Sequence, residues 1–224
     1  MRFDAVVLDF DGVLAESVDV KTRAFAALYA GHGPEVVEQV VAYHLRHGGI
    51  SRFEKFRHYH EHLLGKPLST SEEADLGTRF AALVEEAVVR APWVAGAREF
   101  LDAHHARLPL FVASGTPHDE LQRVVQQRGM AHYFAGVRGS PATKGAIIST
   151  ILASHGLTRT RVLMVGDSST DYDGAMQAGV AFLGIASAAP HAFPAEIPVL
   201  PDLTGLGSFI ADSMATCLPA AQKA

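Results

Sequence analysis

Asp9 and Asp11 are the residues of this chain whose types and spacing most directly suggest catalysis. They lie two positions apart, directly after the apolar run 5–8 and directly before Gly12. If residues 3–9 form a buried parallel strand, the strand ends where open α/β sheets bind ligands. Alternation along that strand puts both carboxylates on one side, so one can attack a substrate while the other transfers a proton. An acidic turn after a strand is the alternative interpretation.

A second apolar run, residues 108–113, ends in Ser114 and Gly115 before a predicted helix. A serine hydroxyl and free backbone N–H groups can hold the oxygens of a phosphate, assisted by the N-terminus of the helix that follows. We therefore predict Ser114 and Gly115 as phosphate ligands. Thr116 and Asp119 are predicted to act mainly as cap and turn residues, which both types favour.

Lys144 lies in the first turn of a third predicted helix, where a positive charge is usually unfavourable. Screening a phosphate together with an attacking aspartate would explain a lysine at this place. A lysine exposed on the surface is the alternative interpretation.

Asp167 follows the apolar run 162–166, and Asp171 comes four residues later. This pattern suggests a hard cation, because Mg²⁺ prefers octahedral oxygen coordination by carboxylates, waters and substrate phosphates. We expect Asp9, Asp167 and the backbone carbonyl of Asp11 to supply protein ligands. Asp171 is expected to fix a metal-bound water or to orient Lys144, although it could also bind the metal directly.

Composition limits the class of protein. The chain has 224 residues, of which 48% are hydrophobic, enough for a large domain with a buried core. A formal net charge of −5 without a long basic run argues against nucleic acid or membrane as the main partner. One cysteine excludes an internal disulfide, and no apolar run reaches signal-peptide or transmembrane length. We expect a cytoplasmic protein, and we leave its oligomeric state open.

Strand and helix patterns alternate from about residue 92, which predicts a parallel sheet. Further strands are expected at 161–166, 133–137, 181–185 and 197–200, and helices at 95–105, 119–128, 143–155 and 172–178. Residues 16–90 instead show helical spacing at 20–29, 34–46, 52–64 and 72–89. Histidines 44, 47, 58, 60 and 62 are expected to be solvated on these helices. The tail 203–224 is expected to form a closing helix.

Taken together and in order, the segments D-F-D-G-V, A-S-G-T, Lys144 and G-D-S-S-T-D resemble the four motifs of the haloacid dehalogenase superfamily. The resemblance implies a Rossmann-like three-layer α/β core with a central parallel sheet, formed by 1–15 and 91–224, and an all-helical cap at 16–90. It also implies Mg²⁺ and a phosphoaspartyl intermediate on Asp9, with Asp11 as acid and base. The helical insertion resembles the mobile cap of the phosphoglycolate phosphatase and β-phosphoglucomutase branch.

Substrate contacts are expected from the cap, where Gly49, Ser51 and Arg52 resemble the glycine-led specificity loop of β-phosphoglucomutase. Arg52 could clamp a substrate anion, and Lys55 lies on the same helical face. A solvated helix start, capped by Ser51, is the alternative. Lys21 occupies the place where the mutase has a histidine that holds back its acid/base aspartate.

These features predict a Mg²⁺-dependent phosphatase that acts on a small phosphorylated metabolite, of the sugar phosphate or phosphoglycolate type. A phosphomutase is the alternative, which Lys21 weakens without excluding. A non-catalytic domain that binds a phosphorylated ligand is a second alternative, and a response-regulator-like phosphoacceptor would leave the helical insertion unexplained.

Overall fold

A six-stranded parallel sheet forms the centre of the computed structural model, which describes residues 3–187, 191 and 193–212. The strands lie in the order β3-β2-β1-β4-β5-β6. This is the Rossmann order, in which the chain runs outward on both sides of β1. The strand bounds are β1 Ala5–Leu8, β2 Leu110–Pro117, β3 Gly136–Ser140, β4 Val162–Gly166, β5 Ala181–Ile185 and β6 Val199–Leu200.

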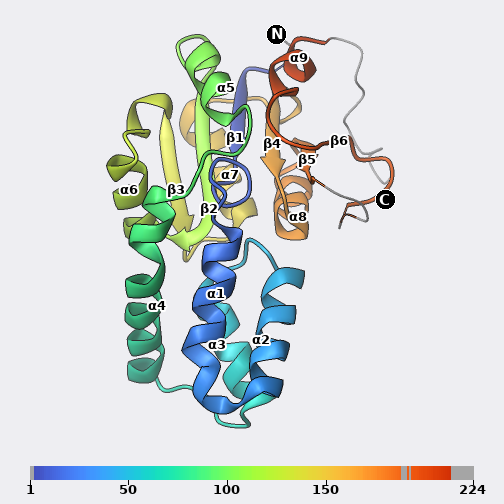
Figure 1. The fold of residues 1–224 in the computed structure, drawn as a ribbon. Helices are drawn as coiled ribbons and strands as arrows, with labels where there is room; N and C mark the ends of the chain where they lie inside the picture. Colours follow the sequence, from blue (N-terminus) through green and yellow to red (C-terminus); the bar gives the residue numbers. More distant parts are fainter. Residues whose placement is uncertain (1–2, 188–190, 192, 213–224) are drawn as a thin grey trace, which may run out of the picture.

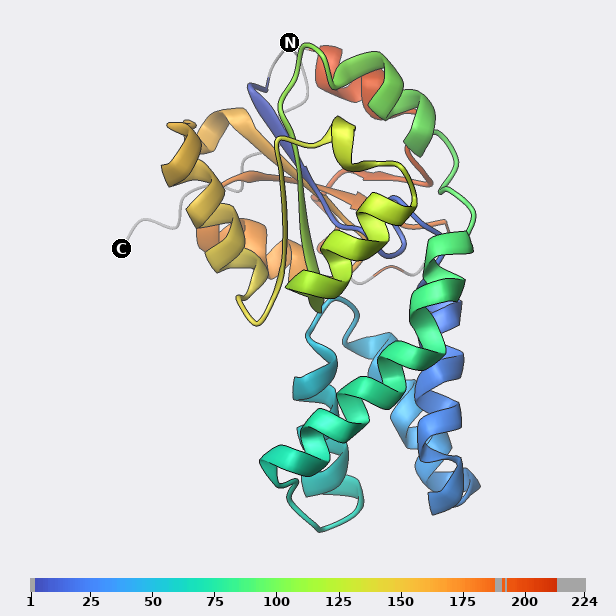
Figure 2. The same cartoon turned by 90° about the vertical axis from the view of Figure 1, so that its left-hand side faces the viewer.

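Helices cover both faces of the sheet, as buried parallel strands require (Figures 1 and 2). Alternate residues of β1 separate into two buried clusters: Val6 and Leu8 pack on one face, and Ala5 and Val7 on the other. The first face is covered by α5 (Ala97–His104), α6 (His118–Gln127) and α9 (Leu206–Ala211), and the second by α7 (Lys144–His155) and α8 (Ser169–Ala178). The expected three-layer α/β core is confirmed.

The chain leaves the sheet after β1 and builds a helical segment that lies below the sheet in Figures 1 and 2. Its bounds are α1 Val18–Tyr29, α2 Pro34–Arg46, α3 Arg52–His58, a π-helical continuation Tyr59–Leu63, and α4 Thr70–Arg90. Phe25 packs against Phe56, Tyr59 and Phe80, with ring centroids 4.4 to 5.9 Å apart. The segment thus has an aromatic core in addition to the contacts it makes with the sheet.

The two connections between this segment and the sheet run side by side. Ala15 forms a bridge with Trp93, and the amide of Glu16 donates to the carbonyl of Pro92 at 2.9 Å. The guanidinium of Arg128 in turn donates to the carbonyls of Val88, Val89 and Ala91, at the end of α4. The chain therefore enters and leaves the helical segment at one place, and a separate cap domain at 16–90 stays a prediction.

Several expected elements differ in extent from the observed ones. The strand expected at 133–137 begins later, because Tyr133 ends a short 3₁₀ turn, Ala131–Tyr133, and its ring packs among histidines. β2 continues through Ser114 to Pro117 instead of ending at residue 113. A closing helix was expected at 203–224, and the structure contains the shorter helix α9 within that range. Residues 213–224 lie outside the described part of the chain.

Candidate active site

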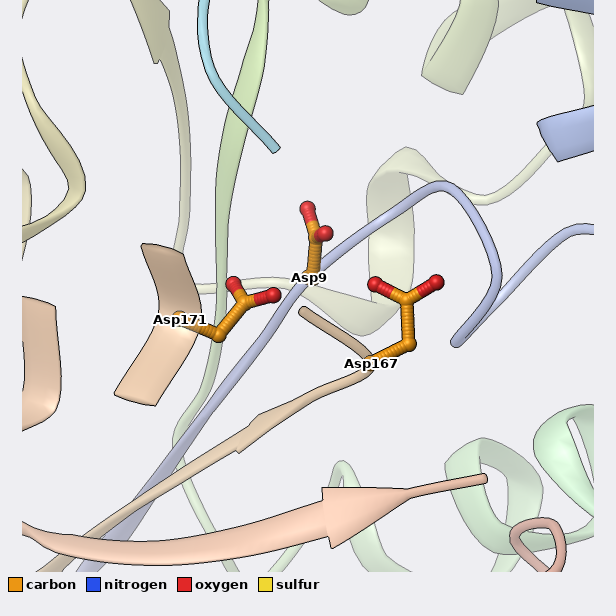
Figure 3. A group of neighbouring side chains, drawn as sticks. All are labelled: Asp9, Asp167 and Asp171. Carbon is orange, nitrogen blue, oxygen red and sulfur yellow. The ribbon is translucent and has the colours of Figure 1, made fainter. Parts of the chain in front are cut away.

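Asp9 and Asp167 meet at the carboxyl edge of the sheet. Asp9 follows β1 and Asp167 follows β4, and these neighbouring strands pair in parallel with Leu8 opposite Val165. The chain order reverses at this point, which is where open α/β sheets place their ligands. Asp171, in the first turn of α8, completes a group whose carboxylate oxygens lie within 4.8 Å of one another (Figure 3).

Gly12 allows this close approach of the loops. Its φ is +79°, and a Cβ at this position would collide with the carboxylate of Asp167. Glycine is the residue type that accepts both conditions. The turn expected after the Asp9 strand therefore needs a glycine at position 12, because Asp167 leaves no room for a side chain there.

Burial and mutual repulsion make this carboxylate group electrostatically costly. Burial, then the neighbouring Asp171, raises the pKa of Asp9 to about 7, although Lys144 opposes the shift. Burial followed by the charge of Asp9 raises the pKa of Asp167 well above its usual value. A nearby cation would relieve both effects. Carboxylate oxygens in this arrangement are the hard donors that Mg²⁺ prefers, so Asp9 and Asp167 fit the expected metal ligands.

Asp171 accepts hydrogen bonds at both of its oxygens. One receives the ammonium of Lys144, and the other receives the amide and the hydroxyl of Ser168, at 3.1 and 2.5 Å. Asp171 also forms the capping box of α8 with Ser168. This set of contacts favours the expected role of orienting Lys144 over that of a direct metal ligand.

Lys144 lies between two carboxylates rather than on the surface. Its Nζ atom is 2.7 Å from Asp9 and also contacts Asp171, and its side chain is buried. Although burial would lower it, the pKa of Lys144 is raised by Asp171 and Asp9, so the ammonium stays charged. The lysine stands at the start of α7 because this ion pair outweighs the unfavourable helix end.

Asp11 is held in its ionised form by three side chains. Lys21 Nζ donates to it at 2.5 Å, the Ser17 hydroxyl at 2.6 Å, and the Thr116 hydroxyl at 3.2 Å. Burial alone would raise the pKa of Asp11, but the charge and hydrogen bond of Lys21 keep it below its usual value. Ser17 begins α1 without capping it, because its hydroxyl is used here instead.

Ser114 and Gly115 line the same region from β2. The Ser114 hydroxyl oxygen accepts the amide of Thr116 at 3.1 Å, and the side chain is buried. A Cβ on Gly115 would collide with the carbonyl of Gly49, so the loop of the helical segment lies directly against the end of β2. Gly49 itself, with φ +79°, is close enough that a Cβ would meet Lys144 Nζ at 2.9 Å.

The two predicted cap cations have different partners. Arg52 donates to both carboxylate oxygens of Glu120, on α6, at 2.9 and 2.5 Å, and both side chains are buried. Lys55 Nζ lies 2.8 Å from His44 Nδ1, and Lys55 as a whole is 2% exposed. Ser51 caps α3, as the alternative interpretation expected, by accepting the amide of Phe53 at 3.4 Å.

A cavity of about 140 Å³ lies between the sheet edge and the helical segment. Most of the predicted site residues line it: Asp9, Asp11, Lys21, Arg52, Lys55 and Ser114. Such a volume is small beside pockets that hold drug-sized ligands. The arrangement combines a buried carboxylate, a second carboxylate with proton-carrying neighbours and several cations, which is chemistry suited to a small anionic ester.

The model of the haloacid dehalogenase-like hydrolase family matches residues 3–179, a span that includes all of these groups. The chain belongs to this family. Among its relatives, the phosphoglycolate phosphatase of Vibrio parahaemolyticus is 26% identical over 95% of this chain and 93% of its own.

Solved structures of low sequence identity share the fold of this hydrolase. CbbY from Rhodobacter sphaeroides, solved with phosphate, has a TM-score of 0.72 and 18% identity, over 92% of this chain and 96% of that one. YfnB from Bacillus subtilis, solved with magnesium, has a TM-score of 0.69 and 15% identity, over 95% of this chain and all of that one, 100%. These two likenesses show the Rossmann-like core of the family.

Sequence reasoning missed three contributors to the site. Thr116 was expected to act as a cap but instead bonds Asp11 and accepts from Lys21 at 2.7 Å. Glu120 gave no signal, because an acid in the first turn of a helix is ordinary. His44, expected to be solvated, is 6% exposed and packs against Phe25, since it lies on the inner face of α2. A helical wheel of α2 could have found this position.

Proposed function

We propose that this hydrolase is a Mg²⁺-dependent phosphatase that cleaves a small phosphate monoester through a phosphoaspartyl intermediate on Asp9. The observation that carries the proposal is the position of Asp9, which lies buried beside Lys144 and faces the same cavity as Asp11. A buried carboxylate next to a cation is suited to nucleophilic attack on a phosphorus atom. The name of the V. parahaemolyticus relative supports a phosphate ester as substrate.

In this mechanism each residue has a separate task. Asp9 attacks the phosphorus, and Lys144, Ser114 and Gly115 hold the phosphoryl oxygens. Asp11 gives a proton to the leaving oxygen and afterwards takes one from the water that cleaves the aspartyl phosphate. The first step requires a proton on Asp11, which a substrate that binds as its phosphate monoanion supplies. The second step requires the ionised form, which the contacts of Asp11 stabilise. Mg²⁺, held by Asp9, Asp167 and the Asp11 carbonyl, would offset the repulsion between carboxylate and phosphate.

We also propose that residues 16–90 act as a cap that opens to admit the substrate and closes to exclude water. The adjacent connections at Glu16 and Pro92, together with Gly12, are the candidate hinges. Contacts across the boundary support a closed state here: the Thr170 hydroxyl donates to the Gly48 carbonyl at 2.6 Å, and Arg52 pairs with Glu120.

A phosphomutase remains the second candidate, favoured by one observation. Lys21 bonds the predicted acid/base Asp11, which is the contact expected of the histidine that a mutase has at this place. The two activities separate on whether phosphate is released or moved, and on whether a bisphosphate is needed for turnover.

The test is phosphate release from a panel of small phosphate esters, with Mg²⁺ or with EDTA, by the wild type and Asp9→Asn. We expect metal-dependent phosphate release by the wild type. In Asp9→Asn the rate should fall on the order of a thousandfold or more, since removing a nucleophile leaves only weak residual catalysis. Release that is equal in Asp9→Asn would contradict the mechanism. No release from any ester would favour the mutase or the non-catalytic alternative.

Within the described residues, no helix combines the length and apolarity needed to cross a membrane. We propose a cytoplasmic location, which the single cysteine of the chain supports. Localisation of a tagged full-length protein in cell fractions tests it.

A further inference from the structure

The cations around the cavity differ in how their charges are compensated. Lys21 contacts the carboxylate of Asp11, Arg52 that of Glu120, and Lys144 those of Asp9 and Asp171. Each of these positive charges therefore has a negative partner within the protein.

Lys55 is the exception among the described residues that line the cavity and are buried. Both hydrogen-bond partners of its Nζ are atoms of His44: Nδ1 at 2.8 Å and the backbone carbonyl at 3.4 Å. Neither partner carries a negative charge. A buried ammonium without a counter-charge is strongly unfavourable, and burial accordingly lowers the pKa of Lys55 to about 7. An anion that arrives with the substrate would supply the missing charge.

His44 holds the lysine in place. Burial, followed by the charge of Lys55, lowers the pKa of His44 to about 3, so its ring stays neutral and Nδ1 keeps the lone pair that accepts from Lys55. The ring lies 4.7 Å from that of Phe25, centroid to centroid, in the aromatic core of the helical segment. The ammonium is thus attached to a rigid part of the cavity wall.

Lys55 lines the same cavity as the residues proposed to bind the phosphate. It lines the cavity from α3, and Asp9 and Ser114 line the same cavity from the sheet edge. Its charge interacts with groups from both sides of the cavity, namely Lys21, Asp11, Lys144 and Asp167. A cavity of about 140 Å³ suits a small substrate, in which an anion at Lys55 and the phosphate belong to one short molecule.

We propose that Lys55, positioned by His44, binds a carboxylate that the substrate carries close to its phosphate. Among the described cations that line the cavity, Lys55 is the single buried one without a negative partner, and one such charge favours a carboxylate over a second phosphate dianion. The substrate class is therefore the phosphorylated small hydroxy acids, of which phosphoglycolate is the smallest. The inference rests on the proposed phosphatase function and adds to it the group that selects the substrate.

The test compares two esters of similar size, phosphoglycolate and 2-hydroxyethyl phosphate, which differ in the carboxylate. In Lys55→Gln we expect the ratio of their kcat/KM values to fall about tenfold to a hundredfold, the loss typical of a hydrogen bond to a charged group. Lys55→Arg should restore part of the ratio. Lys66→Gln removes an exposed lysine of the same segment, and it should leave the ratio unchanged.

His44→Phe tests the positioning role. It keeps an aromatic ring beside Phe25 and removes Nδ1, so KM for phosphoglycolate should rise more than KM for 2-hydroxyethyl phosphate, and more than kcat falls for either ester. If His44 had a purely structural role, kcat/KM would fall by the same factor for both esters. Thermal denaturation of each variant shows that it is folded.

Failure of this inference is separable from failure of the phosphatase proposal. If the wild type cleaves both esters and Lys55→Gln lowers kcat/KM equally for both, the inference is wrong and the phosphatase proposal stands. If neither ester is cleaved, their binding to Asp9→Asn is followed by thermal shift. The inference is supported if Asp9→Asn binds phosphoglycolate more tightly than 2-hydroxyethyl phosphate and the double variant Asp9→Asn with Lys55→Gln does not. It is overturned if Asp9→Asn, with Lys55 present, binds the two esters equally.

Discussion

Arg52 and Glu120 form a buried, two-pronged ion pair between the helical segment and the sheet layer. The two guanidinium nitrogens lie 2.9 and 2.5 Å from the two carboxylate oxygens, and the side chains are 5% and 7% exposed. The pair connects α3 to α6, so it must break if the segment swings away from the sheet. Arg52, expected from the sequence to clamp the substrate, has its charge compensated in this conformation, and its role in substrate binding stays a prediction.

We predict that Arg52 and Glu120 act as a latch for closure. Arg52→Met and Glu120→Gln should each lower kcat/KM about tenfold to a hundredfold for acidic and neutral esters alike, because both destabilise the closed state. The double variant should lose no more than the worse single one, which corresponds to a coupling of about 1–3 kcal/mol. Steady-state kinetics of the four proteins measure this cycle.

The matched control for the latch is Arg123→Gln. Arg123 pairs with Glu85 and also joins α6 to the helical segment, but it is 51% exposed, so its loss should change kcat/KM less than threefold, by order of magnitude. A loss in Arg52→Met confined to the carboxylate ester would show a substrate clamp instead.

Replacing Lys21 should move the acid limb of the pH profile. In the wild type the pKa of Asp11 lies below its usual value because Lys21 outweighs burial, so Asp11 is ionised across the neutral range. In Lys21→Met burial is unopposed by that charge and the pKa of Asp11 rises. Hydrolysis of the aspartyl phosphate uses Asp11 as a base, so we expect its rate to decline at a higher pH on the acid side in Lys21→Met. The dephosphorylation rate measured in a pH series checks this, and Lys21→Arg should keep the wild-type limb.

The selectivity for an acidic ester should decrease as the pH rises. Lys55 has a pKa of about 7, lowered first by burial and then by Lys21, and it faces the charged or titratable groups Lys21, Asp11, Lys144, Asp167 and His44. Below this pH the free enzyme carries the ammonium that attracts a carboxylate, and above it the amine is neutral. KM for phosphoglycolate should therefore rise above pH 7 relative to KM for 2-hydroxyethyl phosphate. The same relative KM from pH 6 to 9 would contradict a role for Lys55.

A methyl group at Gly49 should impair closure. Gly49 has φ +79°, and an added Cβ would collide with Thr170 and Ser168 and meet Lys144 Nζ at 2.9 Å. Gly65 has φ +63° with nothing within 4 Å of the added Cβ, so Gly65→Ala measures the backbone cost alone, about 1 kcal/mol. We expect Gly49→Ala to lose kcat/KM at least tenfold, by order of magnitude, beyond Gly65→Ala, with a similar melting temperature. Equal kinetics in the two variants would show that the loop does not press on the site.

Much of the fold could be predicted because it depends on local pattern. Buried parallel strands are continuous apolar runs, and the runs before Asp9 and Asp167 identified β1 and β4. Helical spacing identified the segment after β1. Boundaries were less certain where neighbours decide them: β2 extends through Ser114 because it pairs with β3, with Pro117 opposite Ser140.

The sequence by itself determined which groups gather at the site. Asp9, Asp167 and Lys144 each stand at a strand or helix end, and parallel strands bring such ends to one edge of the sheet. This inference needs only chain order and periodicity, so it does not depend on side-chain packing.

Only the tertiary structure decided how the charges are paired. Glu120, on α6, lies 68 residues from Arg52, and no local pattern couples them. That contact compensates Arg52 and leaves Lys55 with neutral His44 as its partner. The physical reason is that an ion pair depends on distance and burial in space, and both are set by how the helical segment packs against the sheet.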